Sequence, residues 1–258
     1  VFAVNTACAS SAFSIGLGYD MIRNGQADLV ITGGADSIIN AEEIEGFNAL
    51  YALSVQNDPP WKACKPFSKD RDGFVIGEGA GTVILESEES ALRRGAGIYA
   101  EVAGYAATSE AYNIMAPMTD GAGMAFTMER ALQASGVGKE EIDYINAHGT
   151  STELNDRYET LAIKQVFGDR AGRIPVSSTK SMIGHTIGAA GAIESVVTVL
   201  SVHHDLLTPT INLDTPDPEL DLDYVPNSAR PHKVRVAMSN SFGFGGHNAT
   251  VVFRKYPG

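Results

Sequence analysis

The chain has 258 residues, 44% hydrophobic and 19% charged, so it can bury a large core as one domain or two modest ones. Its net charge of −12 disfavours non-specific binding to nucleic acid or an anionic membrane, and leaves room for a local basic patch. The two cysteines, Cys8 and Cys64, lack any paired spacing, which indicates a reducing compartment. Glu194 interrupts the apolar run 187–202, so we expect no membrane span, and no signal peptide is recognisable.

The first half of the chain, residues 1–96, alternates between predicted strands and helices. In order, the expected elements are a strand at 1–6, a helix at 10–23, a buried strand at 29–32, a loop at 57–60, a strand at 82–85 and a short charged helix ending at 94–95. Because a helix joins the first two strands, we expect a parallel sheet with helices on its faces.

The second half, residues 97–258, repeats this strand, loop and helix style. The expected elements are helices at 123–135 and 156–167, strands at 142–146 and 174–178, a helix with Ile193, Val196, Val197 and Leu200 on one face, and closing strands at 234–238 and 249–254. The two halves together predict a duplicated α/β architecture.

Cys8 stands where the first predicted strand passes into a helix. A thiol at a helix N-terminus faces unpaired N–H groups and the positive end of the helix dipole, which favour the thiolate. The same N–H groups can stabilise an oxyanion on a carbonyl that the sulfur attacks. Most cysteines in such turns are small buried hydrophobes, so the remaining polar loops decide between the two interpretations.

Three further polar loops follow predicted strands, at 148–152, 180–186 and 242–248. Ligands of open α/β sheets bind beyond the carboxyl ends of strands, so these loops and Cys8 can form one pocket. A thiol, His148, His185 and Lys180 together suit thioester chemistry, in which imidazoles serve an enolate and an ammonium stabilises negative charge. Taken singly, each histidine would be an ordinary hydrogen-bonding group and Lys180 a surface charge.

These motifs together resemble the β-ketoacyl-acyl-carrier-protein synthases, the condensing enzymes of the thiolase-like fold, and most of all their type I/II elongating group. The matching stretches are 5–8 (NTAC), 65–74 (KPFSKDRDGF), 146–152 (NAHGTST), 180–185 (KSMIGH) and 240–246 (NSFGFGG). The resemblance implies duplicated α/β halves in αβαβα layers, here with an incomplete first half, because the family carries a further region before the nucleophile. The remainder of the N-terminal half would be 1–96 and the C-terminal half 97–258.

The resemblance also implies roles for individual residues. Cys8 would accept the acyl group, and His148 and His185 would decarboxylate a malonyl unit and stabilise its enolate. Lys180 would be the nearby electrostatic lysine, paired with Glu159, and the N–H groups of Cys8 and Phe244 would form the oxyanion hole, with Phe244 as a gate. Thr150 and Thr152 would bind the phosphopantetheine arm, and Phe47 and Phe242 would border the acyl pocket. Some relatives hold a structural monovalent cation, for which Asn146, Glu194, Ser239 and Asn240 match.

The implied function is decarboxylative Claisen condensation in fatty acid elongation, without a required cofactor. The implied partners are acyl carrier protein, acyl and malonyl thioesters and a second copy of the chain, in the cytoplasm or plastid stroma. Three alternatives stay open. A polyketide ketosynthase would use the same residues, an inactive acyl- or carrier-binding fragment would bind without acylation, and a thiolase would need a second cysteine that loop 243–246 lacks.

Overall fold

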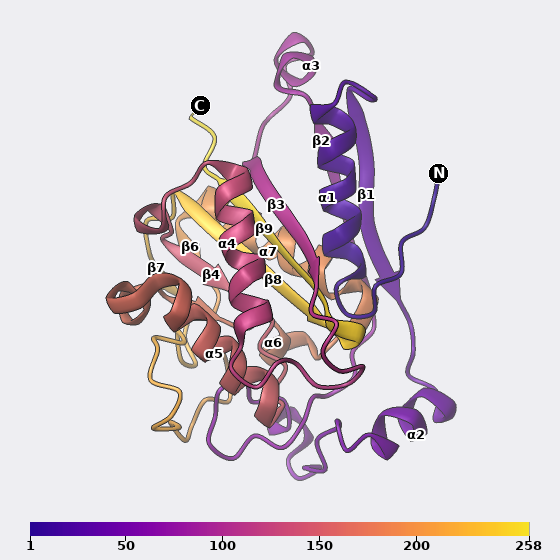
Figure 1. Cartoon of the computed structure of the whole chain (residues 1–258), viewed down its shortest axis with the longest axis vertical. Coiled ribbons are helices and arrows are strands. Elements are labelled where there is room, and N and C mark those ends of the chain that lie inside the picture. Colours follow the sequence, from indigo (N-terminus) through magenta and orange to yellow (C-terminus); the bar gives the residue numbers. More distant parts are fainter. Residues whose placement is uncertain (258) are drawn as a thin grey trace.

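The computed structural model describes residues 1–257, and a five-stranded mixed sheet lies at its centre (Figure 1). The strand order is β3 (Glu101–Ser109), β9 (His247–Arg254), β8 (Val236–Gly243), β4 (Tyr144–Asn146) and β5 (Val176–Ser177). The first three strands pair antiparallel, whereas β8, β4 and β5 run parallel. The carboxyl ends of these three parallel strands therefore share one edge, as the positions of the polar loops predict.

Helices cover both faces of this sheet, and a second sheet packs on the outer side of the helices that cover one face (Figure 1). One face packs against α4 (Ala122–Ser135) and α5 (Glu153–Phe167), and the other against α1 (Ser10–Arg23) and α7 (Ala190–His204). Beyond α1 and α7, β1 (Leu29–Asp36) pairs antiparallel with β2 (Gly79–Glu86). Residues 1–257 thus form four of the five expected layers, in the order αβαβ.

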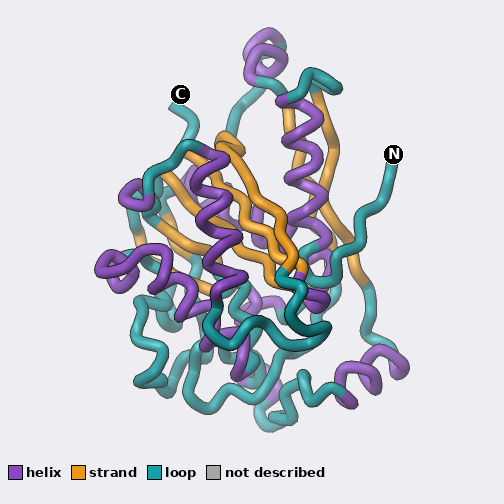
Figure 2. The backbone as a smooth tube through the Cα atoms, in the orientation of Figure 1, coloured by secondary structure: helices purple, strands orange, loops and turns teal. Residues whose placement is uncertain are grey.

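The remaining elements are short. They are α2 (Ala41–Ala49), α3 (Glu88–Arg93), α6 (Lys180–Ile183), β6 (Leu206–Leu207), β7 (Arg230–Pro231) and 3₁₀ turns at Pro60–Lys62, Lys139–Glu141, Gly168–Arg173, Ile187–Ala189 and Phe244–Gly246. Helix α2 buries none of its residues and lies apart from the main body, at the lower right of Figure 1. Figure 2 shows that most long loops gather below the central sheet, on the side where the polar loops converge.

Several sequence predictions are confirmed. Helix α1 spans the predicted 10–23 and ends at Asn24, and α3 ends beside Arg94 as expected. Helix α5 begins three residues before the predicted start, because the Thr152 hydroxyl accepts the Asn155 N–H and caps it. Strand formers and caps are local signals, so such boundaries are readable from sequence.

The predicted strand at 1–6 and its parallel pairing are wrong. Only an isolated bridge joins Thr6 to Cys8, and Phe2 remains 64% exposed. Strand β1 is not the buried parallel strand that we expected, since it pairs antiparallel with β2 and leaves Ile31 69% exposed. A strand needs a neighbour to satisfy its backbone groups, and within residues 1–257 the segment 1–6 has none.

Helix α7 contains the predicted face of Ile193, Val196, Val197 and Leu200. The face with Ile193, Val196 and Val197 is only half-buried, whereas the fully buried face carries Glu194 and small or polar residues. The stretch 187–204 is long and apolar enough to cross a membrane by length and composition, but half of it is buried in the fold. Helix α7 is therefore a core helix with a polar inner face. The contacts of Glu194 in the candidate active site explain that polar face.

Candidate active site

Cys8 sits in a tight turn that leads directly into α1. Ala7 adopts a left-handed φ of 50°, and the Ala9 N–H donates to the Thr6 carbonyl at 3.1 Å. The Ser10 hydroxyl locks the turn by donating to the Ala7 carbonyl at 2.6 Å and accepting the Thr6 N–H at 2.9 Å. The turn places the Cys8 thiol, which is only 5% exposed, against a cavity of about 680 Å³.

The prediction of a low thiol pKa is wrong for this structure. Burial raises the pKa of Cys8 to about 11, and the nearby Lys180 and the N–H groups of Phe244 and Cys8 only partly oppose that rise. The cost of burying a thiolate thus raises the pKa more than the N–H groups at the helix N-terminus lower it. The two N–H groups nevertheless lie beside the sulfur, as the expected oxyanion hole requires.

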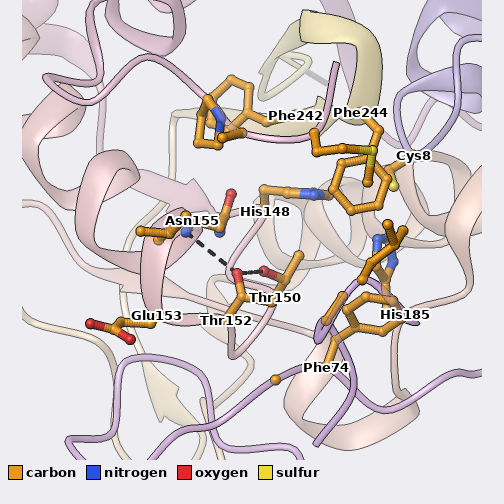
Figure 3. A pocket seen from close by; sticks show the side chains of 18 of the residues that line it. Cys8, Phe74, His148, Thr150, Thr152, Glu153, Asn155, His185, Phe242 and Phe244 are labelled. Carbon is orange, nitrogen blue, oxygen red and sulfur yellow. Dashed lines mark hydrogen bonds between the residues drawn. The ribbon is translucent and has the colours of Figure 1, made fainter. Parts of the chain in front are cut away.

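His148 and His185 come from two different loops and meet Cys8 in the same cavity (Figure 3). His148 follows β4, and His185 follows α6, held by its N–H donating to the Val75 carbonyl at 2.7 Å. The thiol sulfur and one nitrogen of each imidazole all lie within 4.8 Å of one another, and the two rings meet edge to face at 5.3 Å. The structure therefore brings the predicted Cys–His–His set together.

Hydrogen bonds fix the tautomer of both imidazoles. Lys180 Nζ lies 3.2 Å from His148 Nδ1, and an ammonium can only donate, so Nδ1 accepts and Nε2 carries the hydrogen. His185 Nδ1 accepts the Ile187 N–H at 3.3 Å, which likewise leaves the hydrogen on Nε2. Two N–H donors thus face the thiol, an arrangement that suits an oxygen anion rather than a metal ion. The buried His185 Nε2 has no partner among the described residues.

Lys180 pairs with Glu194 and not with Glu159, so the predicted ion pair is wrong. Lys180 Nζ lies 2.5 Å from Glu194 Oε1 and also donates to the His148 carbonyl at 2.7 Å, with both side chains about 1% exposed. Glu159 instead accepts the N–H groups of His148 and Gly149 at 2.9 and 2.8 Å. Glu159 thereby fixes the loop backbone, while Glu194 on α7 neutralises the lysine and explains the polar inner face of that helix.

Burial shapes the protonation of this cluster. It lowers the pKa values of His148 and His185 well below the ordinary range, and the charge of Lys180 adds to that effect, so both imidazoles are neutral at neutral pH. Burial raises the pKa of Glu194 to about 7, against the opposing charge of Lys180. Positive charge behind neutral N–H donors is the electrostatic arrangement that stabilises negative charge on a bound oxygen.

The other predicted pocket residues divide into two groups. Thr150, Thr152, Phe242 and Phe244 line the cavity, and the two threonine hydroxyls lie 2.8 Å apart (Figure 3). Phe47 does not line it and reaches the site only through the ring of Phe74, at 5.3 Å between centroids.

Sequence reasoning missed three residues that hold the site. Phe74 packs edge-on against His185 at 5.2 Å and lines the cavity (Figure 3). The fully buried Asp156 accepts the N–H groups of Phe67 and Ser151 at 2.8 and 3.2 Å, and its carboxylate lies 3.7 Å from Arg71. Arg71 and Phe74 belong to stretch 65–74, so that motif could have indicated a role beside the catalytic loops.

The residues named for a monovalent cation are all buried: Asn146 ends β4, Glu194 lies in α7, and Ser239 and Asn240 lie in the middle of β8. Asn146 and Asn240 use their amide oxygens to accept from Thr179 and Thr250, whereas Glu194 Oε2 has no partner among the described residues. That orphaned carboxylate oxygen fits a cation ligand, although Lys180 already neutralises the group. The cation site stays a prediction.

Comparison with known proteins identifies the family to which this chain is similar. The family description "Beta-ketoacyl synthase, N-terminal domain" matches residues 1–91, and "Beta-ketoacyl synthase, C-terminal domain" matches residues 99–214. The chain is 54% identical over 251 residues to the 3-oxoacyl-[acyl-carrier-protein] synthase 2 of Synechocystis sp., covering 97% of this chain and 60% of the relative.

Two solved structures are also similar. One is a type II polyketide ketosynthase bound to a hexaketide and in complex with its acyl-carrier protein, at TM-score 0.98 and 42% identity, covering 99% of this chain and 63% of that one. The other is a beta-ketoacyl synthase from Burkholderia phymatum, at TM-score 0.93 and 39% identity, covering 98% and 61%.

The fold and the paired domains define a thiolase-like α/β protein. The chain belongs to the beta-ketoacyl synthase family, and it spans about 60% of the length of the curated relative that it matches.

Proposed function

We propose that this chain carries the condensing centre of a β-ketoacyl-acyl-carrier-protein synthase, which joins an acyl thioester to malonyl-carrier protein with loss of CO₂. One observation carries the proposal. A buried thiol faces two N–H donors from neutral imidazoles, with the ammonium of Lys180 behind them. Nucleophile and anion stabilisers thus share one cavity.

In the first half-reaction, Cys8 Sγ attacks the carbonyl carbon of the acyl thioester. The resulting oxyanion accepts hydrogen bonds from the N–H groups of Cys8 and Phe244, which already lie beside the sulfur. The carrier sulfur leaves and takes up the proton that the thiol gives up. Because burial holds the pKa of Cys8 high, the resting group is a thiol, and proton loss accompanies the attack.

In the second half-reaction, the first carrier protein has left, and the phosphopantetheine arm of malonyl-carrier protein binds beside Thr150 and Thr152. The bond to the carboxylate breaks, CO₂ leaves, and the electron pair forms an enolate whose oxygen accepts the Nε2–H groups of His148 and His185. The enolate carbon attacks acyl-Cys8, and Sγ leaves as a thiolate that takes one proton from solvent, the proton that the overall condensation consumes. Neither step requires a redox cofactor.

The partners follow from this chemistry. Acyl carrier protein would deliver both substrates on phosphopantetheine, and a second copy of the chain would complete a homodimer. The Synechocystis relative's name supports fatty acid elongation as the pathway, and a cytoplasmic or stromal location is consistent with it. The likeness to a polyketide ketosynthase supports polyketide extension as the second candidate. A monovalent cation at Glu194 and its neighbours would be structural.

The test supplies acyl- and malonyl-carrier protein and measures both CO₂ and the β-ketoacyl product. We expect His185→Ala to lower product formation by about 10²–10³, since it removes one anion donor. His203→Ala, which changes an exposed histidine on α7, should leave the rate unchanged. Equal rates for the wild type and His185→Ala would contradict the proposed mechanism.

A further inference from the structure

The first turn of α1 is enclosed by glycines from three separate elements. A methyl group on Gly34 of β1 would lie 2.7 Å from Ser11 Cβ, and one on Gly191 of α7 would lie 2.9 Å from Ala12 N. A methyl group on Gly243, at the end of β8, would lie 3.0 Å from Thr6 O and 3.2 Å from Cys8 N. The turn that presents Cys8 therefore has little room to move.

Gly243 differs from the other two because it touches the oxyanion hole. Its φ of −108° is accessible to any residue, so backbone conformation does not call for glycine there. Its three nearest neighbours are all backbone atoms of the Cys8 turn: Thr6 O, Cys8 N and Ala9 N. Gly243 also immediately precedes Phe244, whose N–H is the second donor beside the sulfur. Gly243 thus lies between the two N–H groups of the hole.

The Cys8 turn cannot absorb a displacement easily. The Ser10 hydroxyl ties it through Ala7 and Thr6, and Ala7 already occupies a left-handed conformation. The Ser11 hydroxyl anchors the next position by accepting the Ala192 N–H at 2.8 Å. A side chain at position 243 would therefore move the Phe244 peptide, the Cys8 peptide, or both, by a few tenths of an ångström.

We propose that Gly243 is a positioning residue for acyl transfer, because its lack of a side chain keeps the N–H groups of Cys8 and Phe244 aimed at one oxygen. The inference rests on the proposed function, because acyl transfer is the step that would use the oxyanion hole. It can be tested on the thiol alone. Attack of the sulfur on a carbonyl depends on Gly243, whereas attack on a saturated carbon does not, since only the former creates an oxyanion.

The experiment compares two reactions of Cys8 in the same chain. Acylation by a small activated thioester creates the oxyanion, and alkylation by iodoacetamide does not. Both rates are measured across pH, so that a change in thiol pKa is separated from the reactivity of the thiolate. We expect Gly243→Ala to slow acylation about tenfold or more and alkylation less than about threefold.

Two matched variants serve as controls. Gly34→Ala crowds the same helix turn at Ser11, away from the sulfur, and Gly172→Ala places a methyl group in open space. Both should keep the wild-type ratio of acylation to alkylation. If Gly243→Ala does not fold, Ala7→Gly is added to relax the strained turn, and the ratio of the double variant is expected to fall below that of Ala7→Gly alone.

The outcomes separate this inference from the proposed function. An unchanged ratio in Gly243→Ala, or an equal drop in Gly34→Ala, would overturn the inference, as would a wild-type chain that is alkylated at Cys8 but never acylated by the small thioester. A chain that shows the expected ratios but yields no β-ketoacyl product would retain the inference and lose the proposed function.

Discussion

Two regions of the molecule differ sharply in how firmly they are held. The loops after β4 and β5 hold His148 and Lys180 through buried hydrogen bonds to Glu159 and Glu194. The segment 29–61, which contains β1 and α2, by contrast leaves Ile31, Tyr51 and Trp61 largely exposed. The anion-stabilising part of the site is thus built within these residues, whereas the walls toward Phe47 are only loosely packed. The residues that would stabilise the anion and the residues around Phe47 therefore belong to separate parts of the structure.

The largest expected effect is on the buried ion pair of the firmly held region. Lys180→Ala should lower the free energy of unfolding by about 3–5 kcal/mol, because it leaves Glu194 buried without a counter-charge. Urea denaturation measures this change.

The double variant Lys180→Met with Glu194→Leu sharpens that result, since it removes both charges and should recover most of the loss. Glu159→Gln should not disturb the pair, because Glu159 bonds loop N–H groups instead. A coupling energy between Lys180 and Glu159 as large as that between Lys180 and Glu194 would contradict the observed pairing.

The comparison between the two sheets predicts a smaller contrast in stability. Ile145→Ala in buried β4 should cost about 2–5 kcal/mol through lost burial and a residual cavity. Ile31→Ala in exposed β1 should change stability by less than about 0.5 kcal/mol. Paired denaturant titrations measure both. A large cost at Ile31 would mean that another chain or segment covers β1 in solution.

The pH dependence of Cys8 gives a third prediction. A thiol is the protonated form, and burial raises its pKa to about 11, so thiolate appears only as pH rises toward that value. At about pH 8 the chain should hold roughly a hundredfold less thiolate than a thiol with the ordinary pKa of 9.0. Alkylation rates of a Cys64→Ala chain should keep rising above pH 9. A plateau below that pH would contradict the raised pKa of Cys8.

Local patterns made much of the fold predictable. The bounds of α1 and the position of the polar loops after strands follow from capping residues and periodicity, which act over a few residues. The strand at 1–6 failed because β-propensity needs a partner strand, and sequence does not reveal whether one is present. The parallel pairing of β1 failed for the same reason.

The site was predictable in its residue types but not in its contacts. Cys8, His148 and His185 meet as expected, because each stands in a loop of a recognisable motif. The partner of Lys180 was misassigned, since Glu159 and Glu194 both lie on helices near the site and only three-dimensional packing selects one. The raised pKa of Cys8 was missed because a local helix terminus is visible in sequence, whereas the depth of burial is not.

The most direct measurement is the intact mass of the chain before and after incubation with a long-chain acyl-carrier protein. The account predicts one added acyl mass in the wild type and in Cys64→Ala, and none in Cys8→Ala. An acyl mass that persists in Cys8→Ala, or a wild-type chain that gains none, would contradict the assignment of Cys8 as the acyl-accepting nucleophile.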